Sequence, residues 1–283
     1  MKIVVLGGTG LIGSRLIPLL VAAGHEAIAA SPTTGVDTLT THGLAAALDG
    51  ADAVVDVTNA PDFDHVAEFF DTSTRNALEA ARQAGVTHYV LLSIVGTDAV
   101  PDSAYLTAKA HQEQLVRDSG IPFTIVRATQ FFEFILTLAD AATIDGTVHV
   151  TAALLQPIAA DDVAAALAAV IQDAPASAAT SAAKSDATST ATSPEPGNAT
   201  SPKTGDPASK NPPTPTPGTI ELAGPEQFTQ DDLIRRALDS ASDPRPVVTS
   251  PGYTYLGSPV ARDTLLPGPA ARLGTTRYEE WAS

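Results

Sequence analysis

Short apolar runs alternate with amphipathic stretches along the first 172 residues, and this alternation predicts a layered α/β fold. The runs have the length and the β-branched residues of buried parallel strands, whereas the stretches between them have helical spacing. Strands that alternate with helices in this way require right-handed crossovers, so we expect a doubly wound parallel sheet. The expected strands cover residues 3–6, 26–30, 51–57, 86–93 and 122–127, and the expected helices cover 11–23, 64–84 and 102–119.

Weaker patterns predict further elements on either side of a long polar stretch. We expect Thr229 to cap a helix that runs to Asp239. The last part of the chain, up to residue 281, is rich in proline and is expected to be mostly loop with one short helix. The other expected strands are 36–37, 147–150 and 219–224, and the other expected helices are 38–48, 131–142 and 160–172.

Three glycines follow the first strand directly, at positions 7, 10 and 13. We expect Gly7 to permit a tight turn, Gly10 to let the backbone approach a pyrophosphate, and Gly13 to let the next helix pack closely on the strand. The phosphates would then lie at a helix N-terminus, where unpaired N–H groups and the helix dipole favour an anion. This order of strand, glycine turn and helix predicts a Rossmann-type dinucleotide site. Its expected contacts from the loop are Gly7, Thr9, Gly10, Leu11, Ile12 and Gly13.

The composition changes abruptly after the helix expected at 160–172. Residues 175–218 contain no Val, Ile, Leu, Met, Phe, Tyr or Trp. Such a segment cannot bury enough apolar area to offset the entropy lost on ordering, so we expect a disordered insert at 173–218. This insert would separate a dinucleotide-binding domain, residues 1–172, from a small α+β region, residues 219–283, that completes the same domain and the substrate pocket.

Charge and cysteine content restrict the classes of function. The net charge is −16, whereas nonspecific nucleic-acid binding needs clustered Lys and Arg, so we expect no nucleic-acid partner. The chain has no cysteine, which excludes disulfides and thiolate chemistry and suits a reducing compartment. No apolar stretch approaches membrane-spanning length, and the first apolar run is too short for a signal peptide. We therefore expect a cytoplasmic protein.

Candidate chemistry lies at the expected carboxyl ends of the strands, where doubly wound sheets bind ligands. Ser93 ends one strand, and Tyr105 and Lys109 follow four residues apart on one helix face. Tyr105 is a candidate proton donor for a carbonyl, Lys109 would lower the pKa of that phenol and contact the nicotinamide ribose, and Ser93 would orient the substrate oxygen. Outside the insert, Lys109 and Lys2 are the only lysines, which sets Lys109 apart. An ordinary pair on the helix surface is the alternative.

The end of the second expected strand bears on the choice of cofactor. An NAD site usually places Asp or Glu there, whereas residues 29–34 offer none, so we favour NADP(H) and keep NAD(H) possible. Ser31, Thr33 and Arg15 are candidate contacts of a 2′-phosphate. Asp37 is expected either near the adenine end or as a simple carboxylate at the approach to the next helix. Thr58 and Asn59 follow the next strand and complete the expected cofactor contacts.

The segment after the strand at 122–127 is the expected acceptor side. Gln130, Phe131 and Phe132 are candidate substrate residues, although phenylalanines at this spacing also suit a core. Glu113 lies four residues after Lys109, and we expect it to form a solvated helix pair or to pair with Lys109. The six histidines show no ligand spacing, so no metal is expected.

Six stretches of the chain, in a fixed order, carry a family resemblance. They are VVLGGTGLIG (4–13), YVLLSIVG (89–96), YLTAKAHQE (105–113), SGIPFTIVRATQF (119–131), QPIAADDVA (156–164) and LAGPE (222–226). With them the chain resembles the NmrA-like, NAD(P)H-binding group of atypical short-chain dehydrogenase/reductases, which includes quinone and triphenylmethane dye reductases. The resemblance implies that Lys109 serves the cofactor, that the Tyr position is variable, and that some members only sense the nucleotide. The insert departs from this pattern, because a short loop is expected there.

These observations leave two main hypotheses of function. The first is an NAD(P)H-dependent oxidoreductase of the short-chain dehydrogenase/reductase type, which transfers a hydride to a small carbonyl or quinone-like acceptor. The second is a redox sensor that binds the dinucleotide without turnover and presents a surface to a protein partner. Sugar-nucleotide epimerisation is weaker, because the region after the insert is short for a nucleotide-sugar domain. The fold alone does not choose among them.

Overall fold

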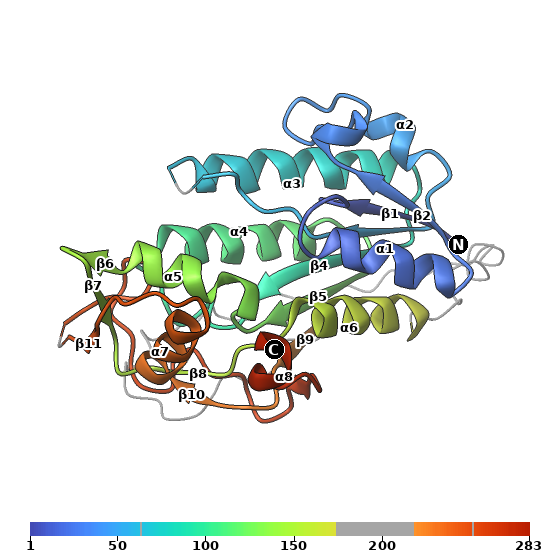
Figure 1. Cartoon of the computed structure of the whole chain (residues 1–283). Coiled ribbons are helices and arrows are strands. Elements are labelled where there is room, and N and C mark those ends of the chain that lie inside the picture. The colour runs from blue at the N-terminus through green and yellow to red at the C-terminus, as the bar shows by residue number, and fades with distance from the viewer. Residues whose placement is uncertain (63, 174–217, 251) are drawn as a thin grey trace, which may run out of the picture.

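The computed structural model describes residues 1–62, 64–173, 218–250 and 252–283. Within these residues, seven strands form one sheet in the order β2, β1, β3, β4, β5, β9, β12 (Figure 1). Each neighbouring pair in this sheet is parallel. The expected Rossmann-type sheet is therefore confirmed. Its strands are β1 (Lys2–Leu6), β2 (Glu26–Ala30), β3 (Ala53–Asp56), β4 (His88–Ile94), β5 (Phe123–Ala128), β9 (Thr219–Ala223) and β12 (Arg272–Leu273).

Helices cover both faces of this sheet, because successive side chains of a strand point to opposite sides. Ile3 and Val5 of β1 pack with α1 and α6 on one face. Val4 and Leu6 pack with α2, α3 and α4 on the other. Burial on both faces explains why the strands are continuous apolar runs. The helices are α1 (Gly13–Ala22), α2 (Leu44–Leu48), α3 (Val66–Gln83), α4 (Ala104–Asp118) and α6 (Ala160–Asp173).

A second group of elements gathers at the end of the sheet toward which β4 and β5 point (Figure 1). It has its own apolar cluster, called here the C-terminal cluster, which contains Phe132, Leu233 and Tyr255. Tyr105 packs against this cluster. Two small sheets lie here, with strand orders β6-β7-β11 and β8-β10. The group comprises α5 (Ile135–Ala141), β6 (Thr143–Ile144), β7 (Thr147–Val150), β8 (Leu154–Leu155), β10 (Phe228–Thr229), α7 (Gln230–Ser240), β11 (Val247–Thr249) and α8 (Tyr278–Ala282).

Two regions differ from the expected elements. Residues 36–37 form no strand, because the Asp37 carboxylate accepts the Leu39 N–H at 2.8 Å and closes a turn. The helix expected at 38–48 is reduced to α2, since Thr41 and Gly43 have φ values of +64° and +69°, which interrupt a helix. The helix expected at 131–142 is divided into a 3₁₀ turn, Phe132–Phe134, and α5.

The expected insert at 173–218 lies outside the described residues except at its two ends. Asp173 is the last residue of α6, and Gly218 precedes β9 with φ +82°. The region after the insert contributes β9 and β12 to the main sheet, beside β5. Its place in the same sheet agrees with the expectation that 219–283 completes the domain, while the domain limits themselves stay a prediction.

Candidate functional site

The order of the strands reverses between β1 and β3. From β1 the chain moves outward to β2, and it then crosses back to build β3, β4 and β5 in succession. The carboxyl ends of β1 and β3 therefore form the switch point of the sheet, the place at which open α/β sheets typically bind ligands in a crevice. The segments that follow β1, β2 and β3 meet at this edge, and they carry most of the predicted cofactor residues.

The glycine loop after β1 has the geometry that its sequence predicts. Gly7 has φ +78°, and a Cβ on Gly13 would lie 2.4 Å from the Gly7 carbonyl oxygen. The turn at Gly7 and the close packing at Gly13 are therefore confirmed. Gly10 is exposed, so the loop is open in front of α1, although the Ser14 N–H in the first turn of this helix already donates to the Gly10 carbonyl oxygen at 3.0 Å. This cradle, which side chains would fill, fits the pyrophosphate of a dinucleotide.

Gly8 is a residue whose importance the sequence analysis missed. A Cβ on Gly8 would lie 2.6 Å from the Ala29 Cα and 2.8 Å from the Val5 carbonyl oxygen. The loop thus crosses directly over β2, and only glycine fits. The alanines of β2 were the available signal, because small residues on a neighbouring strand allow such an approach. Ile12, in contrast, is buried in the core at the start of α1.

Three hydroxyl groups meet at the carboxyl end of β2. Thr9 Oγ1 donates to Ser31 Oγ at 2.9 Å. The Thr33 hydroxyl lies 2.9 Å from Ser31 Oγ and 3.2 Å from Thr9 Oγ1. The structure therefore brings together three of the predicted cofactor residues. Hydroxyls can donate to a ribose oxygen or to a phosphate, and they carry no charge that repels a phosphate.

Asp37 and Arg15 are turned to other partners. Burial raises the pKa of Asp37, but hydrogen bonds from the Leu39 N–H and from Thr40 outweigh it and lower the pKa, as in a turn carboxylate. Arg15 forms an ion pair with Asp161 at 2.9 Å and donates to the Leu11 carbonyl oxygen. The expected contact of Arg15 with a 2′-phosphate is therefore not prepared in this structure, because α6 holds the guanidinium.

The carboxyl end of β3 holds a buried acid and leads to Tyr105. Asp56 accepts hydrogen bonds from the Tyr89 hydroxyl at 2.8 Å and from the Thr58 hydroxyl at 2.7 Å. Thr58 is thereby fixed at the crevice. Asn59 follows, and its Oδ1 accepts a hydrogen bond from the Tyr105 hydroxyl at 2.8 Å. The predicted cofactor residue Asn59 and the predicted proton donor Tyr105 are thus in direct contact.

Tyr105 and Lys109 share a face of α4, as the spacing predicts, and both pack on Phe70. The ring centroids of Phe70 and Tyr105 lie 6.0 Å apart, and Lys109 Nζ lies 4.6 Å from the Phe70 centroid. The ammonium of Lys109 is directed inward, where it donates to the Leu92 carbonyl oxygen at 2.9 Å and to the Gln112 side chain.

The expected lowering of the Tyr105 pKa is wrong. Burial raises the pKa of Tyr105 to about 12. Burial also lowers the pKa of Lys109 to about 8, against the opposing attraction of Asp56 and Glu113. With Lys109 only 3% exposed, desolvation dominates both groups. The Tyr105 phenol therefore keeps its proton over the whole neutral pH range. The Lys109 amine loses its proton at a lower pH than an ordinary lysine.

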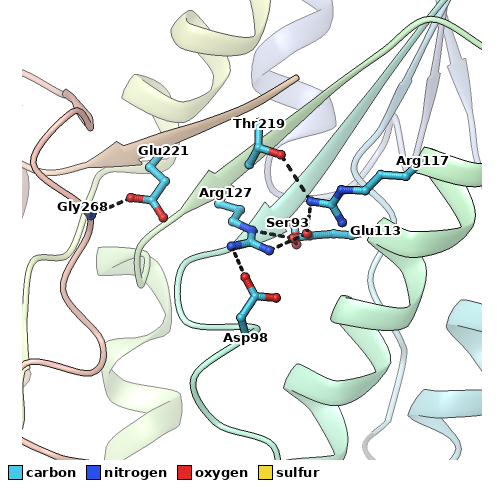
Figure 2. A network of polar contacts seen from close by, with 8 residues as sticks. All are labelled: Ser93, Asp98, Glu113, Arg117, Arg127, Thr219, Glu221 and Gly268. Atoms are coloured by element: carbon cyan, nitrogen blue, oxygen red, sulfur yellow. Dashed lines mark hydrogen bonds and ion pairs between the residues drawn. The ribbon is translucent and has the colours of Figure 1, made fainter. Parts of the chain in front are cut away.

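Ser93 belongs to a buried network between β4, α4 and β5 (Figure 2). Its hydroxyl donates to Glu113 Oε1 at 2.6 Å. Arg127 binds both oxygens of the same carboxylate, at 2.8 and 2.6 Å, and reaches Asp98 at 2.7 Å. Arg117 adds a contact of 2.9 Å to Glu113. Ser93 is therefore at the predicted strand end, but its hydroxyl is directed to Glu113.

This network corrects the expectation for Glu113. The carboxylate is fully buried, and it pairs with Arg127 and Arg117 rather than with solvent or directly with Lys109. Burial opposes the charge of Arg127, yet the hydrogen bonds that it donates to Glu113 and Asp98 raise its pKa. A buried ion pair is retained only with such complete pairing. Arg127, placed on an apolar strand, was the available signal, because a buried strand arginine requires an acidic partner.

The predicted substrate residues after β5 separate into two kinds. Phe132 is buried in the C-terminal cluster, with its ring centroid 5.4 Å from that of Tyr278. Phe131 is half-buried and stacks on Phe134 at 5.8 Å. Gln130 is 8% exposed, and its backbone carbonyl accepts the Ile158 N–H at 2.8 Å. Phe132 is therefore a core residue, while Gln130 and Phe131 remain candidates for the acceptor side.

Within residues 1–62, 64–173, 218–250 and 252–283, no three His, Cys, Asp or Glu side chains group closely enough to hold a metal ion. No helix in the described parts of the chain combines the length and apolar character that spanning a bilayer requires.

The fold and the glycine loop define a dinucleotide-binding α/β protein. A family model described as NAD(P)H-binding matches residues 7–174, which is more than half of the chain. The chain belongs to this NAD(P)H-binding family, in the NmrA-like group of atypical short-chain dehydrogenase/reductases. The resemblance drawn from the sequence is therefore confirmed, and so is an NAD(P)H-binding, reductase-type fold.

Two curated relatives are reductases. The chain is 33% identical over 160 residues to (4-alkanoyl-5-oxo-2,5-dihydrofuran-3-yl)methyl phosphate reductase from Streptomyces griseus. These residues cover 52% of this chain and 54% of the relative. It is 33% identical over 157 residues to NAD(P)H azoreductase from Xenophilus azovorans, covering 49% of this chain and 51% of the relative. The chain thus spans about half the length of the curated relatives it matches.

Solved structures share the fold at lower identity. An NADPH-dependent quinone oxidoreductase from Escherichia coli, complexed with NADPH, is 21% identical with a TM-score of 0.57, over 88% of this chain and 78% of the other. A triphenylmethane reductase from Citrobacter sp., complexed with NADP(H), is 17% identical with a TM-score of 0.57, over 88% and 79% of the two chains.

Proposed function

We propose that this protein is an NADPH-dependent reductase that transfers a hydride to a small carbonyl or quinone-like acceptor, with Tyr105 as the proton donor. The observation that carries this proposal is the hydrogen bond from the Tyr105 hydroxyl to Asn59 Oδ1, 2.8 Å long, beside the crevice at the end of β3. This bond fixes a protonated phenol at the edge of the sheet where the cofactor would lie. The reductase names of the two curated relatives support the class of reaction.

The chain's residues would divide the work between binding and proton transfer. The glycine loop would hold the pyrophosphate, and Thr58 and Asn59 would border the nicotinamide half. Bound reduced nicotinamide supplies the hydride to the carbonyl carbon. Tyr105 would give its proton to the carbonyl oxygen, and the phenolate would regain a proton from water. An alkoxide is more basic than a phenolate, so a raised phenol pKa still allows this transfer.

Lys109 and Ser93 would act less directly than their sequence pattern predicts. Lys109 holds the Leu92 carbonyl at the end of β4, so we assign it to the support of the cofactor edge. Ser93 remains a candidate for orienting the substrate oxygen, which would require its hydroxyl to turn away from Glu113. Both roles are weaker than that of Tyr105, because the partners of Ser93 and Lys109 lie in the protein interior, whereas the Tyr105 hydroxyl donates to Asn59 at the end of β3.

We further propose a preference for NADP(H) over NAD(H). The cluster formed by Thr9, Ser31 and Thr33 offers hydroxyls, and no acidic residue occurs among residues 29–34. A carboxylate at this position would repel a 2′-phosphate, whereas hydroxyls would bind it. We also propose a small-molecule substrate, no nucleic-acid partner and a cytoplasmic location, on the basis of the acidic charge and the absence of cysteine.

One observation favours the alternative of a dinucleotide-binding redox sensor without turnover. The Ser93 hydroxyl is bound to Glu113 and the Lys109 ammonium is bound to Leu92 and Gln112. Ser93, Tyr105 and Lys109 therefore do not converge on one point. A sensor would need the glycine loop but not this convergence, and a protein partner belongs only to this alternative.

The test is NADPH oxidation by the purified protein with benzaldehyde and with menadione, in wild type, Tyr105→Phe and Tyr253→Phe. Tyr253 stacks on His149 at 6.0 Å and serves as the matched control. We expect Tyr105→Phe to lower the rate with benzaldehyde about 100-fold, and with menadione less, because a hydroquinone anion needs less proton donation. NADPH affinity, measured by fluorescence titration, should not change.

Two results would contradict the proposal in different ways. An unchanged benzaldehyde rate in Tyr105→Phe would remove Tyr105 as the donor but leave a reductase. Tight NADPH binding without oxidation by either acceptor would contradict the reductase and favour the sensor.

A further inference from the structure

Gln130 carries a buried amide whose polar atoms have no hydrogen-bond partner within the described residues. Both Oε1 and Nε2 are buried in this way, and the residue is only 8% exposed. Buried polar side chains almost always find a partner, so an orphaned amide needs an explanation. The backbone of Gln130 is fixed by the Ile158 N–H, which donates to its carbonyl at 2.8 Å. The backbone is therefore fixed at the end of β5, while the side-chain amide has no hydrogen-bond partner among the residues that the structure describes.

Tyr255 comes to the same region from the C-terminal part of the chain. It forms a tight turn in which the Tyr255 N–H donates to the Ser258 carbonyl at 2.8 Å and the Ser258 N–H donates back at 3.0 Å. The two central residues, Leu256 and Gly257, have φ values of +48° and +86°. Leucine rarely adopts such a φ, and strain of this kind is found where a side chain must be positioned. The turn holds the Tyr255 ring, 7% exposed, in the C-terminal cluster.

Gln130, Tyr255 and Tyr105 lie close to one another. Tyr105 packs against the apolar cluster to which Tyr255 belongs. Burial raises the pKa of Tyr255 to about 12, while the Gln130 side chain opposes this and the Tyr105 hydroxyl adds to it, so both groups lie near the Tyr255 hydroxyl. The Gln130 amide approaches this hydroxyl without completing a hydrogen bond by distance and angle. Two phenols and one amide therefore face a common region beside the proposed proton donor.

We propose that Tyr255 is a second acceptor-binding residue, which, oriented by Gln130, donates a hydrogen bond to a carbonyl oxygen of the molecule that is reduced. This proposal rests on the proposed function and adds the substrate class and the residues that select it. Nε2 of Gln130 would donate to the Tyr255 oxygen, which leaves the Tyr255 O–H free for the acceptor. Oε1 of Gln130 would remain to accept from a hydroxyl group of the acceptor or of the product.

The surroundings favour a carbonyl compound with an apolar body. Leu256, Val260 and Ile94 pack against the same cluster as Tyr105 and Tyr255. Apolar walls with a few convergent polar groups are typical of small-molecule sites. A hydrogen bond to one carbonyl oxygen would discriminate against hydrocarbons of the same shape, because the site's buried polar groups would otherwise stay unpaired. Aldehydes, ketones and quinones share the group that this pair would recognise.

The experiment separates binding from chemistry. Isothermal titration calorimetry measures benzaldehyde and menadione binding to the protein loaded with NADP⁺, which cannot deliver a hydride. Steady-state kinetics with NADPH give KM and kcat for the same two probes. Both are run on wild type, Tyr255→Phe, Gln130→Met and the control Tyr253→Phe, which lies in the same segment. Phe keeps the ring that packs in the cluster, and NADPH titration checks that each variant is folded.

We expect Tyr255→Phe to weaken probe binding and to raise KM about fivefold to tenfold, the effect of one lost hydrogen bond to a neutral oxygen, with kcat and NADPH affinity within about twofold of wild type. Gln130→Met should act in the same direction. The double variant should be no worse than the more affected single variant, because both changes remove one interaction. Tyr253→Phe should match wild type.

The outcomes distinguish this proposal from the proposed function. Turnover with an unchanged KM in Tyr255→Phe would overturn the role of Tyr255 and leave the reductase in place. Probe binding that weakens in Tyr255→Phe without any turnover of NADPH would support Tyr255 and contradict the reductase. Wild-type protein that binds neither probe would overturn this proposal, whatever cofactor it binds.

Discussion

The two sides of the candidate site are built in different ways. The cofactor side comes from the first 60 residues, where the glycine loop, the hydroxyls at the end of β2 and Asn59 all follow consecutive strands of the sheet. The acceptor side is assembled from Tyr105 on α4, Gln130 after β5 and Tyr255 beyond the insert. The first depends on local backbone geometry and the second on the packing of distant segments. A sequence motif can encode the former, whereas only the folded chain shows the latter.

The largest effect is expected from a side chain added to the glycine loop, because this change affects the cofactor side alone. In Gly13→Ala the new Cβ would meet the Gly7 carbonyl oxygen at 2.4 Å, so the loop must shift. Overpacking of this kind costs roughly 1–3 kcal/mol, and because the displaced loop would have to return to its present position to hold the pyrophosphate, a similar cost would raise the dissociation constant of NADPH by about 5- to 150-fold. Fluorescence titration of NADPH measures it.

Gly120→Ala is the matched control for this change. Gly120 has φ +75°, and no atom of the described residues lies within 4 Å of the added Cβ. The change should cost about 1–2 kcal/mol of stability, because alanine is strained at a positive φ, and it should leave NADPH affinity unchanged. Equal NADPH affinity in Gly13→Ala and wild type would contradict the assignment of the loop to the cofactor.

A second prediction concerns the pKa of Lys109, which lies between the cofactor side and the acceptor side. The lysine pKa falls from its usual 10.5 to about 8 in the folded protein. Between these values the unfolded chain binds more protons than the folded chain, so the free energy of unfolding rises with pH. Lys109→Met removes this contribution. We expect the stability advantage of Lys109→Met over wild type to shrink by roughly 2–3 kcal/mol between pH 7 and pH 10.

Urea unfolding of both proteins at several pH values measures this difference, and the shared ionisation of other groups cancels between them. An advantage that stays constant across this range would mean that Lys109 titrates normally. The ammonium would then be available to Tyr105, as the sequence pattern predicts.

The smallest expected effect concerns the choice of nucleotide. Thr33→Asp places a carboxylate in the hydroxyl cluster at an exposed position, so folding should tolerate it. The new charge should repel a 2′-phosphate and accept from a 2′-hydroxyl, which shifts the ratio of NADPH to NADH affinity by on the order of 10-fold toward NADH. Titrations with both nucleotides measure the ratio.

Thr87→Asp adds the same charge at the opposite edge of the sheet, just before β4, and should leave the ratio unchanged. A shift in Thr87→Asp equal to that in Thr33→Asp would assign the effect to net charge. It would then say nothing of the site.

The sequence predicted what depends on neighbouring residues. The limits of β2 and β7, the turn at Gly7 and the close packing at Gly13 follow from local patterns, and the structure confirms them. The strand at 36–37 failed because one side chain, Asp37, closes a turn there. That competition between a short strand and a turn depends on one hydrogen bond, which no periodicity reveals.

The partners of buried polar groups were the part that the sequence did not reveal. Lys109 was expected at Tyr105 and Ser93 at the substrate, whereas Leu92 and Glu113 hold them. Glu113 finds Arg127 only because α4 packs across β4 and β5 (Figure 2). Such pairs depend on the rotation of a helix over a sheet, and a shift of one residue would exchange the partners. Tyr255 was missed because it lies beyond the insert, and only the packing of distant segments brings it into the same cluster as Tyr105.

The proposed function requires that a hydride pass directly from the cofactor to a carbonyl carbon at this site. Reduction of benzaldehyde with NADPH that carries deuterium on one or the other face of the transferable ring position tests this transfer. We expect deuterated benzyl alcohol from one of the two labelled cofactors and unlabelled alcohol from the other. Unlabelled alcohol from both, or tight NADPH binding with no alcohol formed, would contradict the proposed function.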